Sequence, residues 1–250
     1  MSTHGAGGTH RCPVRPAFSM RPTRVDDLNM KPEPSCPRCG RVVQPPGLWT
    51  SAWQCDAHGP VAPLQGIRTP GIATLEAVLP HAQVPVWIPW PLPGGWVVTG
   101  FAEVGDERTG ALATAVALSG PNPLGGVGEL VVVAEDPGIG LGARLAGLEG
   151  SDPGLGFDKG PPDAKVRFDG HEMALWNLDV GRDRAVYAGE ALAHWLWVVF
   201  ASADTGILMG EINALRDLRD MRDGGSAFEL PFGAPSPFLE RMLARRDTSA

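Results

Sequence analysis

Two short motifs with the same internal spacing constrain this 250-residue chain more than any other feature. Each motif places two residues that can bind a metal three positions apart, and fifteen residues separate the motifs: Cys36 and Cys39, then Cys55 and His58. A gap of two residues lets both ends of one tight turn reach the same ion. Glycine accepts the left-handed backbone of such a turn, and it follows each motif as Gly40 and Gly59. The pattern predicts a tetrahedral zinc site with three cysteine ligands and one histidine ligand.

Four protein ligands complete the tetrahedron of zinc, whereas a catalytic zinc keeps one position open for water. The surrounding segment, residues 33–63, is too short to bury a core that would fold alone. We therefore expect a zinc-ribbon-like module in which the ion has a structural role. A catalytic zinc, or iron in its place, is the weaker alternative. The fourth cysteine, Cys12, is expected to be a free thiol or a substitute for a lost ligand.

Runs of β-branched residues dominate the chain after residue 96, bounded by Gly, Pro, Asn and Asp. The short gaps between these runs favour hairpins and antiparallel pairing. Asp169-Gly170 is a favoured two-residue turn, which predicts a hairpin over residues 164–179. Helical spacing of apolar residues predicts helices over 71–79, 205–221 and 237–246. The expected class is α+β: a small zinc ribbon followed by a mostly antiparallel β-rich domain with a few helices.

The expected organisation has five parts. The chain begins with a disordered tail over 1–32, which the zinc-ribbon-like module follows over 33–63. A linker and extended segment rich in proline and tryptophan covers 64–95. The α+β body covers 96–236, and a C-terminal helix with its tail covers 237–250. The tail is rich in Gly, Pro, Thr and Arg and shows no apolar periodicity, which is typical of disorder.

The net charge of −7 makes the surface acidic overall. An acidic surface repels phosphate backbones, so nucleic acid is disfavoured as a partner. The first twenty residues lack the apolar core of a signal peptide, and the longest uncharged stretch, residues 84–101, contains four prolines. These features predict a cytoplasmic protein with no membrane span, whose partner is an unidentified protein or small molecule.

Two glycine-rich segments, residues 119–128 and 136–143, are candidate ligand-binding loops. The second contains Gly138, Gly140 and Gly142 after a predicted strand, and backbone amides in such a loop can hold a phosphate. An acyl phosphate or coenzyme A type of ligand would suit them, and the chain would then be a small-molecule enzyme. The βαβ context of a dinucleotide site is missing, so a surface connection in a glycine-rich chain is the competing interpretation.

Side chains for nucleophilic or acid–base catalysis do not form a pattern. There is no G-x-S-x-G motif, and His81, His171 and His194 are scattered. The sequence therefore identifies no catalytic residue.

Four tryptophans are candidates for an interaction surface: Trp49, Trp53, Trp87 and Trp90. Aromatic residues among prolines can form a binding groove. The alternative is packing of these rings in the core of the protein.

Five segments, among them "EPSCPRCG", "WQCDAHG" and "VPVWIPWPLPGGW", together resemble an uncharacterised family of actinobacterial proteins. Members of that family have a zinc-ribbon-like head and a body of unknown function, and some carry a phosphotransacetylase label. The resemblance implies no residue roles beyond the four metal ligands. The leading hypothesis is a binding or interaction module with a structural zinc, and the alternative is the small-molecule enzyme.

Overall fold

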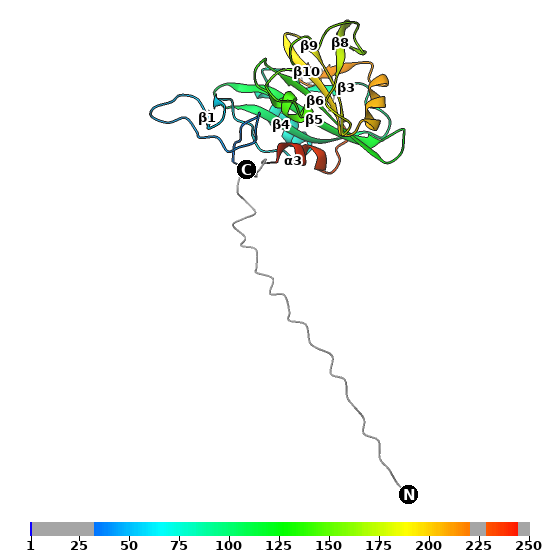
Figure 1. Ribbon diagram of the computed structural model, residues 1–250, viewed down its shortest axis with the longest axis horizontal. Coiled ribbons are helices and arrows are strands. Elements are labelled where there is room, and N and C mark those ends of the chain that lie inside the picture. The colour runs from blue at the N-terminus through cyan, green and yellow to red at the C-terminus, as the bar shows by residue number, and fades with distance from the viewer. Residues whose placement is uncertain (2–32, 221–228, 245–250) are drawn as a thin grey trace. The chain divides into compact units, whose positions relative to one another are not determined.

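Seven strands form one antiparallel sheet at the centre of the protein (Figure 1). The computed structural model describes residue 1 and residues 33–220 and 229–244. The tail predicted over 1–32, Cys12 within it and the chain after residue 244 lie outside the described residues. From residue 33 on, the described residues belong to one compact unit.

The seven-stranded sheet has the order β4-β5-β6-β10-β9-β8-β7. Its strands are β4 (Val97–Asp106), β5 (Gly110–Pro121), β6 (Val127–Glu135), β7 (Ala164–Phe168), β8 (His171–Leu178), β9 (Ala185–Ala191) and β10 (His194–Phe200). Every neighbouring pair is antiparallel. Two small sheets pair β1 (Gln54–Cys55) with β2 (Gly59–Pro60), and β3 (Trp87–Pro89) with β11 (Leu215–Asp217).

The helices are short: α1 (Ile72–Val78), α2 (Leu141–Ala146), α3 (Pro237–Leu243) and the 3-10 helices η2 (Leu79–His81) and η3 (Asp204–Gly210). Within the described segments, no helix has the length and apolar surface that crossing a membrane requires. The structure is thus mostly antiparallel β with few helices, as the sequence predicted for an α+β protein.

The central strands of the large sheet are buried on both faces. On β6, Leu130 and Val132 contribute to one hydrophobic cluster, whereas Val131 and Val133 contribute to a second. Successive side chains of a strand point to opposite faces, so a strand buried on both sides reads as a continuous apolar run. This explains why the central strands show little alternation of polar and apolar residues.

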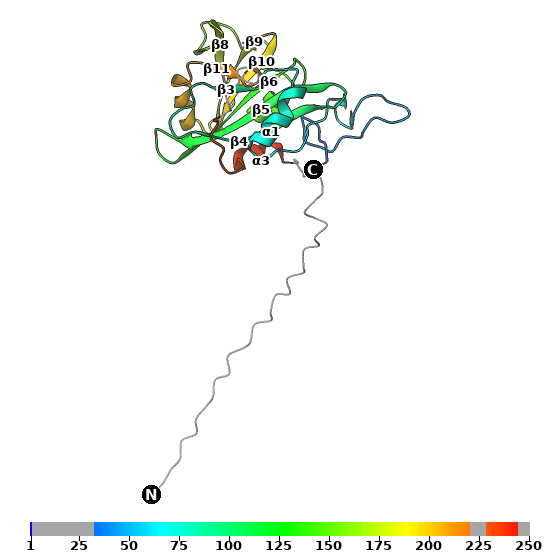
Figure 2. The same cartoon turned by 180° about the vertical axis from the view of Figure 1, so that it is seen from behind.

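Different elements cover the two faces. The first cluster includes residues of α1, β3, η3 and β11, and the second includes residues of α2 and α3. Figure 1 shows α3 beside the sheet, and Figure 2, seen from behind, shows α1 in front of it. Small residues line the side under α2 and α3, with Ala113, Ala115 and Ala117 of β5 all buried there. Small side chains let a covering helix approach the sheet closely.

The hairpin predicted around Asp169-Gly170 is present as β7 and β8. Both turn residues have positive φ, 48° and 79°, as a type I′ turn requires. The helices predicted over 71–79 and 237–246 are present as α1 and α3.

The prediction of one helix over residues 205–221 is wrong. The segment forms η3 and then β11, which pairs with β3 through Leu215 and Pro89. Most of its apolar residues, including Leu208 and Leu218, are buried, whereas Ile207 is 56% exposed. Backbone pairing with β3 favours extended structure over residues 215–217. The Asp217 carboxylate adds to this by accepting from the backbone N–H of Val86 at 3.0 Å. Periodicity identified burial but could not decide between helix and strand.

We expect Gly142→Ala to destabilise the protein even though alanine favours helices. A Cβ at position 142 in α2 would lie 2.3 Å from the ring of Trp197. Overpacking of this kind costs about 1–3 kcal/mol. The matched control is Gly210→Ala, because Gly210 also lies in a helical segment and a Cβ there meets nothing within 4 Å. Urea denaturation of both variants checks this, and equal effects would contradict it.

Candidate metal centre

Two tight turns of the 33–63 segment carry the four predicted ligands. In the first turn, the N–H of Gly40 donates to the carbonyl of Cys36 at 2.8 Å. In the second, the N–H of His58 donates to the carbonyl of Cys55 at 3.3 Å, between strands β1 and β2. We call these two turns the first and second knuckle. Each one directs both of its ligand side chains to the same side.

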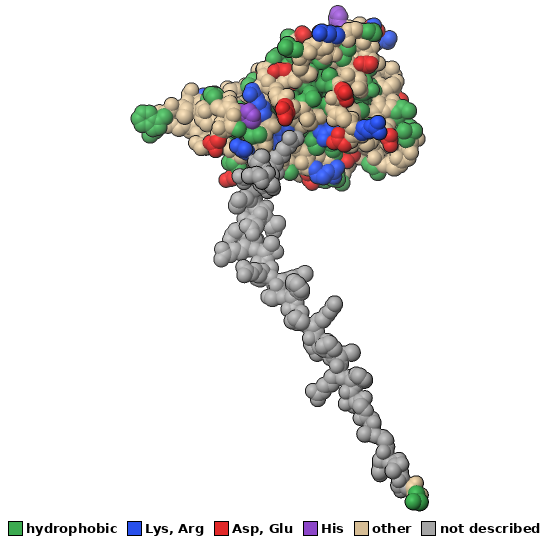
Figure 3. Space-filling model, viewed as in Figure 1, with side chains coloured by type: hydrophobic (Ala, Val, Ile, Leu, Met, Phe, Trp, Pro, Cys, Tyr) green, Lys and Arg blue, Asp and Glu red, His purple; other side chains and the backbone are tan. Residues whose placement is uncertain are grey.

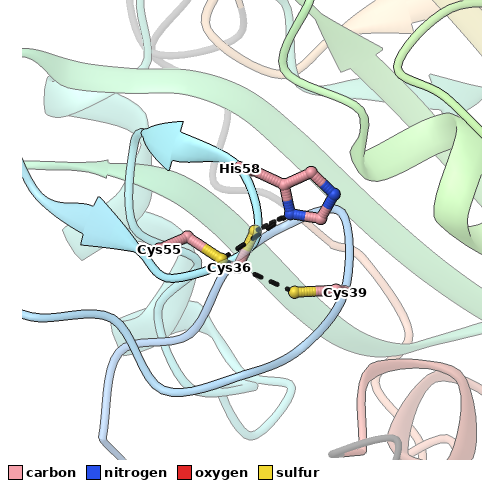
Figure 4. A group of neighbouring side chains, drawn as sticks. All are labelled: Cys36, Cys39, Cys55 and His58. Carbon is pink, nitrogen blue, oxygen red and sulfur yellow. Dashed lines mark hydrogen bonds between the residues drawn. The ribbon is translucent and has the colours of Figure 1, made fainter.

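The ligand atoms of the two knuckles converge on one point (Figure 4). The four atoms, three Sγ and the His58 Nδ1, all lie within 4.8 Å of one another. Cys39 Sγ is 3.7 Å from Cys55 Sγ, and the His58 Nδ1 is 3.5 Å from Cys36 Sγ and 3.6 Å from Cys55 Sγ. A tetrahedral zinc, with bonds of about 2.3 Å to sulfur and 2.0–2.1 Å to nitrogen, separates sulfurs by about 3.8 Å and sulfur from nitrogen by about 3.6 Å. The residues present therefore fit such an ion.

The three described cysteines are free thiols. A disulfide requires about 2.05 Å between sulfurs, far less than the 3.7 Å between Cys39 and Cys55. The arrangement therefore corresponds to a ligand set rather than to a disulfide.

Burial and charge act differently on the thiols of the centre. Burial raises the pKa of Cys36 to about 12, although hydrogen bonds from the backbone N–H groups of Cys39 and Arg38 act in the opposite direction. Burial also acts to raise the pKa of Cys55, but hydrogen bonds from the backbone N–H groups of Ala57 and His58 outweigh it and lower that pKa. Metal binding needs thiolates, so loading the centre releases protons. Backbone N–H groups of the knuckles are placed to stabilise the resulting charge.

The module is attached to the body along strand β4. Ser35 and Leu64 exchange backbone hydrogen bonds of 2.9 and 2.7 Å, and Leu64 forms a bridge with Val104 of β4. The indole N–H of Trp53 donates to the Asp106 carboxylate at 2.9 Å. Trp53 thus packs between the module and the body.

The four candidate tryptophans do not share one surface. Trp87 is only 1% exposed in the core, where its ring meets Phe168 edge-on at 4.7 Å. Trp90 is half-buried, with the guanidinium of Arg216 5.1 Å from its ring centre. Trp49 is 96% exposed, and its neighbour Leu48 is 98% exposed. Of the four, Trp49 is the one available as a contact residue.

The two glycine-rich segments lie at opposite ends of strand β6. Residues 119–128 precede the strand and 136–143 follow it. Nine residues of strand span about 27 Å, so the two segments cannot line one pocket together.

Carboxylates of the chain itself accept hydrogen bonds from backbone N–H groups of the second segment. Glu135 accepts from the N–H of Leu141 at 2.7 Å and from that of Gly142 at 3.1 Å. Asp152 accepts from the N–H of Gly138 at 2.9 Å. The helix end where a phosphate would bind is therefore filled by Glu135, and this geometry speaks against an anionic ligand at Gly138, Gly140 and Gly142.

The side chain of Glu135 has no exposed surface, and sequence analysis did not identify it. Burial raises its pKa to about 7 from the ordinary 4.5, although the N–H groups of Gly142 and Leu141 act in the opposite direction. Because the folded pKa is raised, the folded protein binds more protons than the unfolded chain between those pH values. Its contribution to stability is complete below about pH 4.5 and is lost as the pH rises through about 7.

We expect the Glu135→Gln variant to lose this pH dependence. The free energy of unfolding of the wild type, minus that of the variant, should fall by up to about 3 kcal/mol between about pH 5 and pH 8. Taking the difference cancels the pH dependence of metal binding, which both proteins share. Chemical denaturation across this range measures it, and a difference that stays constant with pH would contradict the assignment.

Of the scattered histidines, His194 has an acidic neighbour: its Nδ1 lies 2.8 Å from the Asp136 carboxylate. A hollow of about 490 Å³ is lined by Trp90, Arg167 and Arg216, among others. The residues that line it do not include His194 or the metal ligands.

A model of a family of unknown function, DUF6758, matches residues 30–239, and the chain belongs to that family. The match includes the four convergent ligands and nearly all of the described body. No curated protein and no solved structure matches the chain.

Proposed function

We propose that the chain is a cytoplasmic zinc protein, in which a structural zinc holds a ribbon-like module that presents an aromatic contact residue to a protein partner. The observation that carries the zinc is the convergence of three sulfurs and one imidazole nitrogen at tetrahedral separations. This donor set suits zinc, and reduced cysteines suit the cytoplasm. The four ligands leave no open position for water, which supports a structural role.

The module has almost no core apart from its ligands. Its hydrophobic cluster contains three buried residues, Cys36, Val43 and Cys55, and the half-buried residues packed against it are Cys39, Trp53 and Val61. Half of these six side chains are metal ligands. Removing the metal would therefore remove what holds the two knuckles together.

The contact residue we propose is Trp49, together with Leu48. Both lie in a turn that the N–H of Gly47 closes by donating to the carbonyl of Thr50 at 2.9 Å. In Figure 3 hydrophobic side chains gather at the outer end of the projection that the module forms. Tryptophan is enriched among the residues that dominate protein–protein binding energy. The acyl phosphate or coenzyme A alternative has no comparable support, because its two loops lie apart.

We expect purified wild type to contain one zinc per chain and Cys39→Ser to contain none. The melting temperature of the variant should fall by about 10 °C or more, because a structural zinc contributes directly to folding. Cys12→Ser, which removes a cysteine that is not one of the four proposed ligands, is the control and should retain zinc. Mass spectrometry for metals and a thermal melt provide both readouts. Wild type prepared under reducing conditions without metal, or with iron, would contradict the zinc assignment.

The contact residue is tested by photo-crosslinking in cells that express the chain. Benzoylphenylalanine in place of Trp49 should give a defined protein adduct, and this adduct should disappear when Cys39→Ser is added. The same group in place of Leu155, which is also fully exposed, is the control and should give none. Equal adducts at both positions, or none at position 49, would contradict the proposed contact.

A further inference from the structure

Arg144 of α2 is a buried cation that connects the first knuckle with the C-terminal helix. Its side chain is among the largest that are fully buried, with 1% exposure. Nη1 donates to the carbonyl of the ligand Cys36 at 3.3 Å, and Nη2 donates to the carbonyl of Ala244 at 2.9 Å. Ala244 is the residue that ends α3. One guanidinium therefore bridges two segments that lie more than two hundred residues apart in the sequence.

The guanidinium lies directly against the first knuckle. A Cβ on Gly40 would be 2.5 Å from Nη2 of Arg144. The second knuckle has a glycine of the same backbone conformation, with φ of 68° at Gly59 compared with 73° at Gly40. A Cβ on Gly59 would meet nothing within 4 Å. The contact with Arg144 therefore distinguishes two knuckles that are otherwise alike.

A second arginine also joins the first knuckle to α2, but it belongs to the knuckle and donates toward the helix. Arg38, between the ligands of the first knuckle, donates through Nε to the carbonyl of Ile139 at 3.3 Å and through Nη2 to the carbonyl of Gly138. These carbonyls lie just before α2. The first knuckle and α2 are thus connected by two side chains, Arg144 from the helix and Arg38 from the knuckle.

The charge of a zinc-loaded centre would favour its contact with Arg144. A zinc ion with three thiolates and a neutral imidazole carries a formal charge of −1. A buried guanidinium nearby favours that state, because opposite charges attract strongly where water is excluded. Without the ion this negatively charged complex is absent, and its attraction for the guanidinium is lost.

We propose that Arg144 is a positioning residue that couples metal loading to the docking of α3 on the body. This inference rests on the zinc centre proposed above. Loading the centre holds the carbonyl of Cys36 in place, this carbonyl holds the guanidinium, and the guanidinium holds the end of α3. Loss of the metal loosens a helix that contains no metal ligand.

The test compares zinc affinity and hydrogen exchange in four full-length proteins: wild type, Arg144→Gln, Arg144→Lys and Arg184→Gln. Arg184 is the matched control, because its Nη1 donates to the carbonyl of Leu145 in α2 at 2.8 Å and its Nη2 pairs with Asp183, neither of which belongs to a knuckle. Zinc affinity is measured by competition with a chromophoric chelator. Hydrogen exchange of residues 237–244 is measured with and without zinc.

Arg144→Gln should bind zinc about 10- to 100-fold more weakly, as is usual when a group that supports a metal ligand is removed. Arg144→Lys should recover part of the affinity, since it retains the charge without the planar fork. Arg184→Gln should stay within about twofold of wild type. In wild type, removal of zinc should accelerate exchange in residues 237–244, and in Arg144→Gln the exchange should already be fast and insensitive to zinc.

Glycine variants test the contact without changing the charge. Gly40→Ala and Gly59→Ala impose the same backbone strain, so their difference isolates the contact with Arg144. Gly40→Ala should bind zinc more weakly than Gly59→Ala by about tenfold, and this gap should shrink when Arg144→Gln is added, because the space is then free. The pair also tests the inference should the Arg144 variants fail to fold.

Two results together would overturn the coupling and leave the zinc centre intact. They are a zinc affinity of Arg144→Gln within about twofold of wild type, and hydrogen exchange of α3 in wild type that does not change when zinc is removed. A glycine pair with equal affinities would also overturn it. Absence of zinc from wild type would instead overturn the proposed function itself.

Discussion

The convergence of three thiols and one imidazole at a single point is the constraint on which the rest of the account depends. Side chains of this kind gain little by packing together, and the segment that carries them has scarcely any other core. A tetrahedral ion gives the convergence a physical reason, because it stabilises the thiolates and fixes the separations that are observed. The hairpin, the exposed turn at Trp49 and the contact with α2 all depend on the two knuckles being held together.

The body supplies a rigid support for this module. Its central strands are buried on both faces, and small residues under α2 let that helix lie close to the sheet. Glu135, at the end of β6, anchors the start of α2 by accepting from two of its amides. The helix that carries Arg144 therefore contacts both the sheet, through Glu135, and the first knuckle, through Arg38 and Arg144. This arrangement supports the proposed coupling between the first knuckle and the body.

Sequence predicted best what is encoded locally. The spacing of Cys36 and Cys39 specifies a turn that brings both sulfurs to one ion, and Asp169-Gly170 specifies a hairpin turn, so both could be recognised without a structure. The contact of Arg144 with Cys36 spans 108 residues, and the role of Glu135 depends on a helix that begins after it. No local pattern marks either residue. Likewise, the apolar spacing over 205–221 predicted a helix, but pairing with β3 decided the structure of residues 215–217.

The most direct test of the account is X-ray absorption at the zinc edge on the full-length protein. The account predicts one zinc per chain, with three sulfur neighbours at about 2.3 Å and one nitrogen at about 2.0–2.1 Å. It also predicts that the spectrum does not change when substrate-like anions such as phosphate are added, because the coordination sphere is closed. A first shell containing water oxygen or only two sulfurs would contradict the closed structural centre.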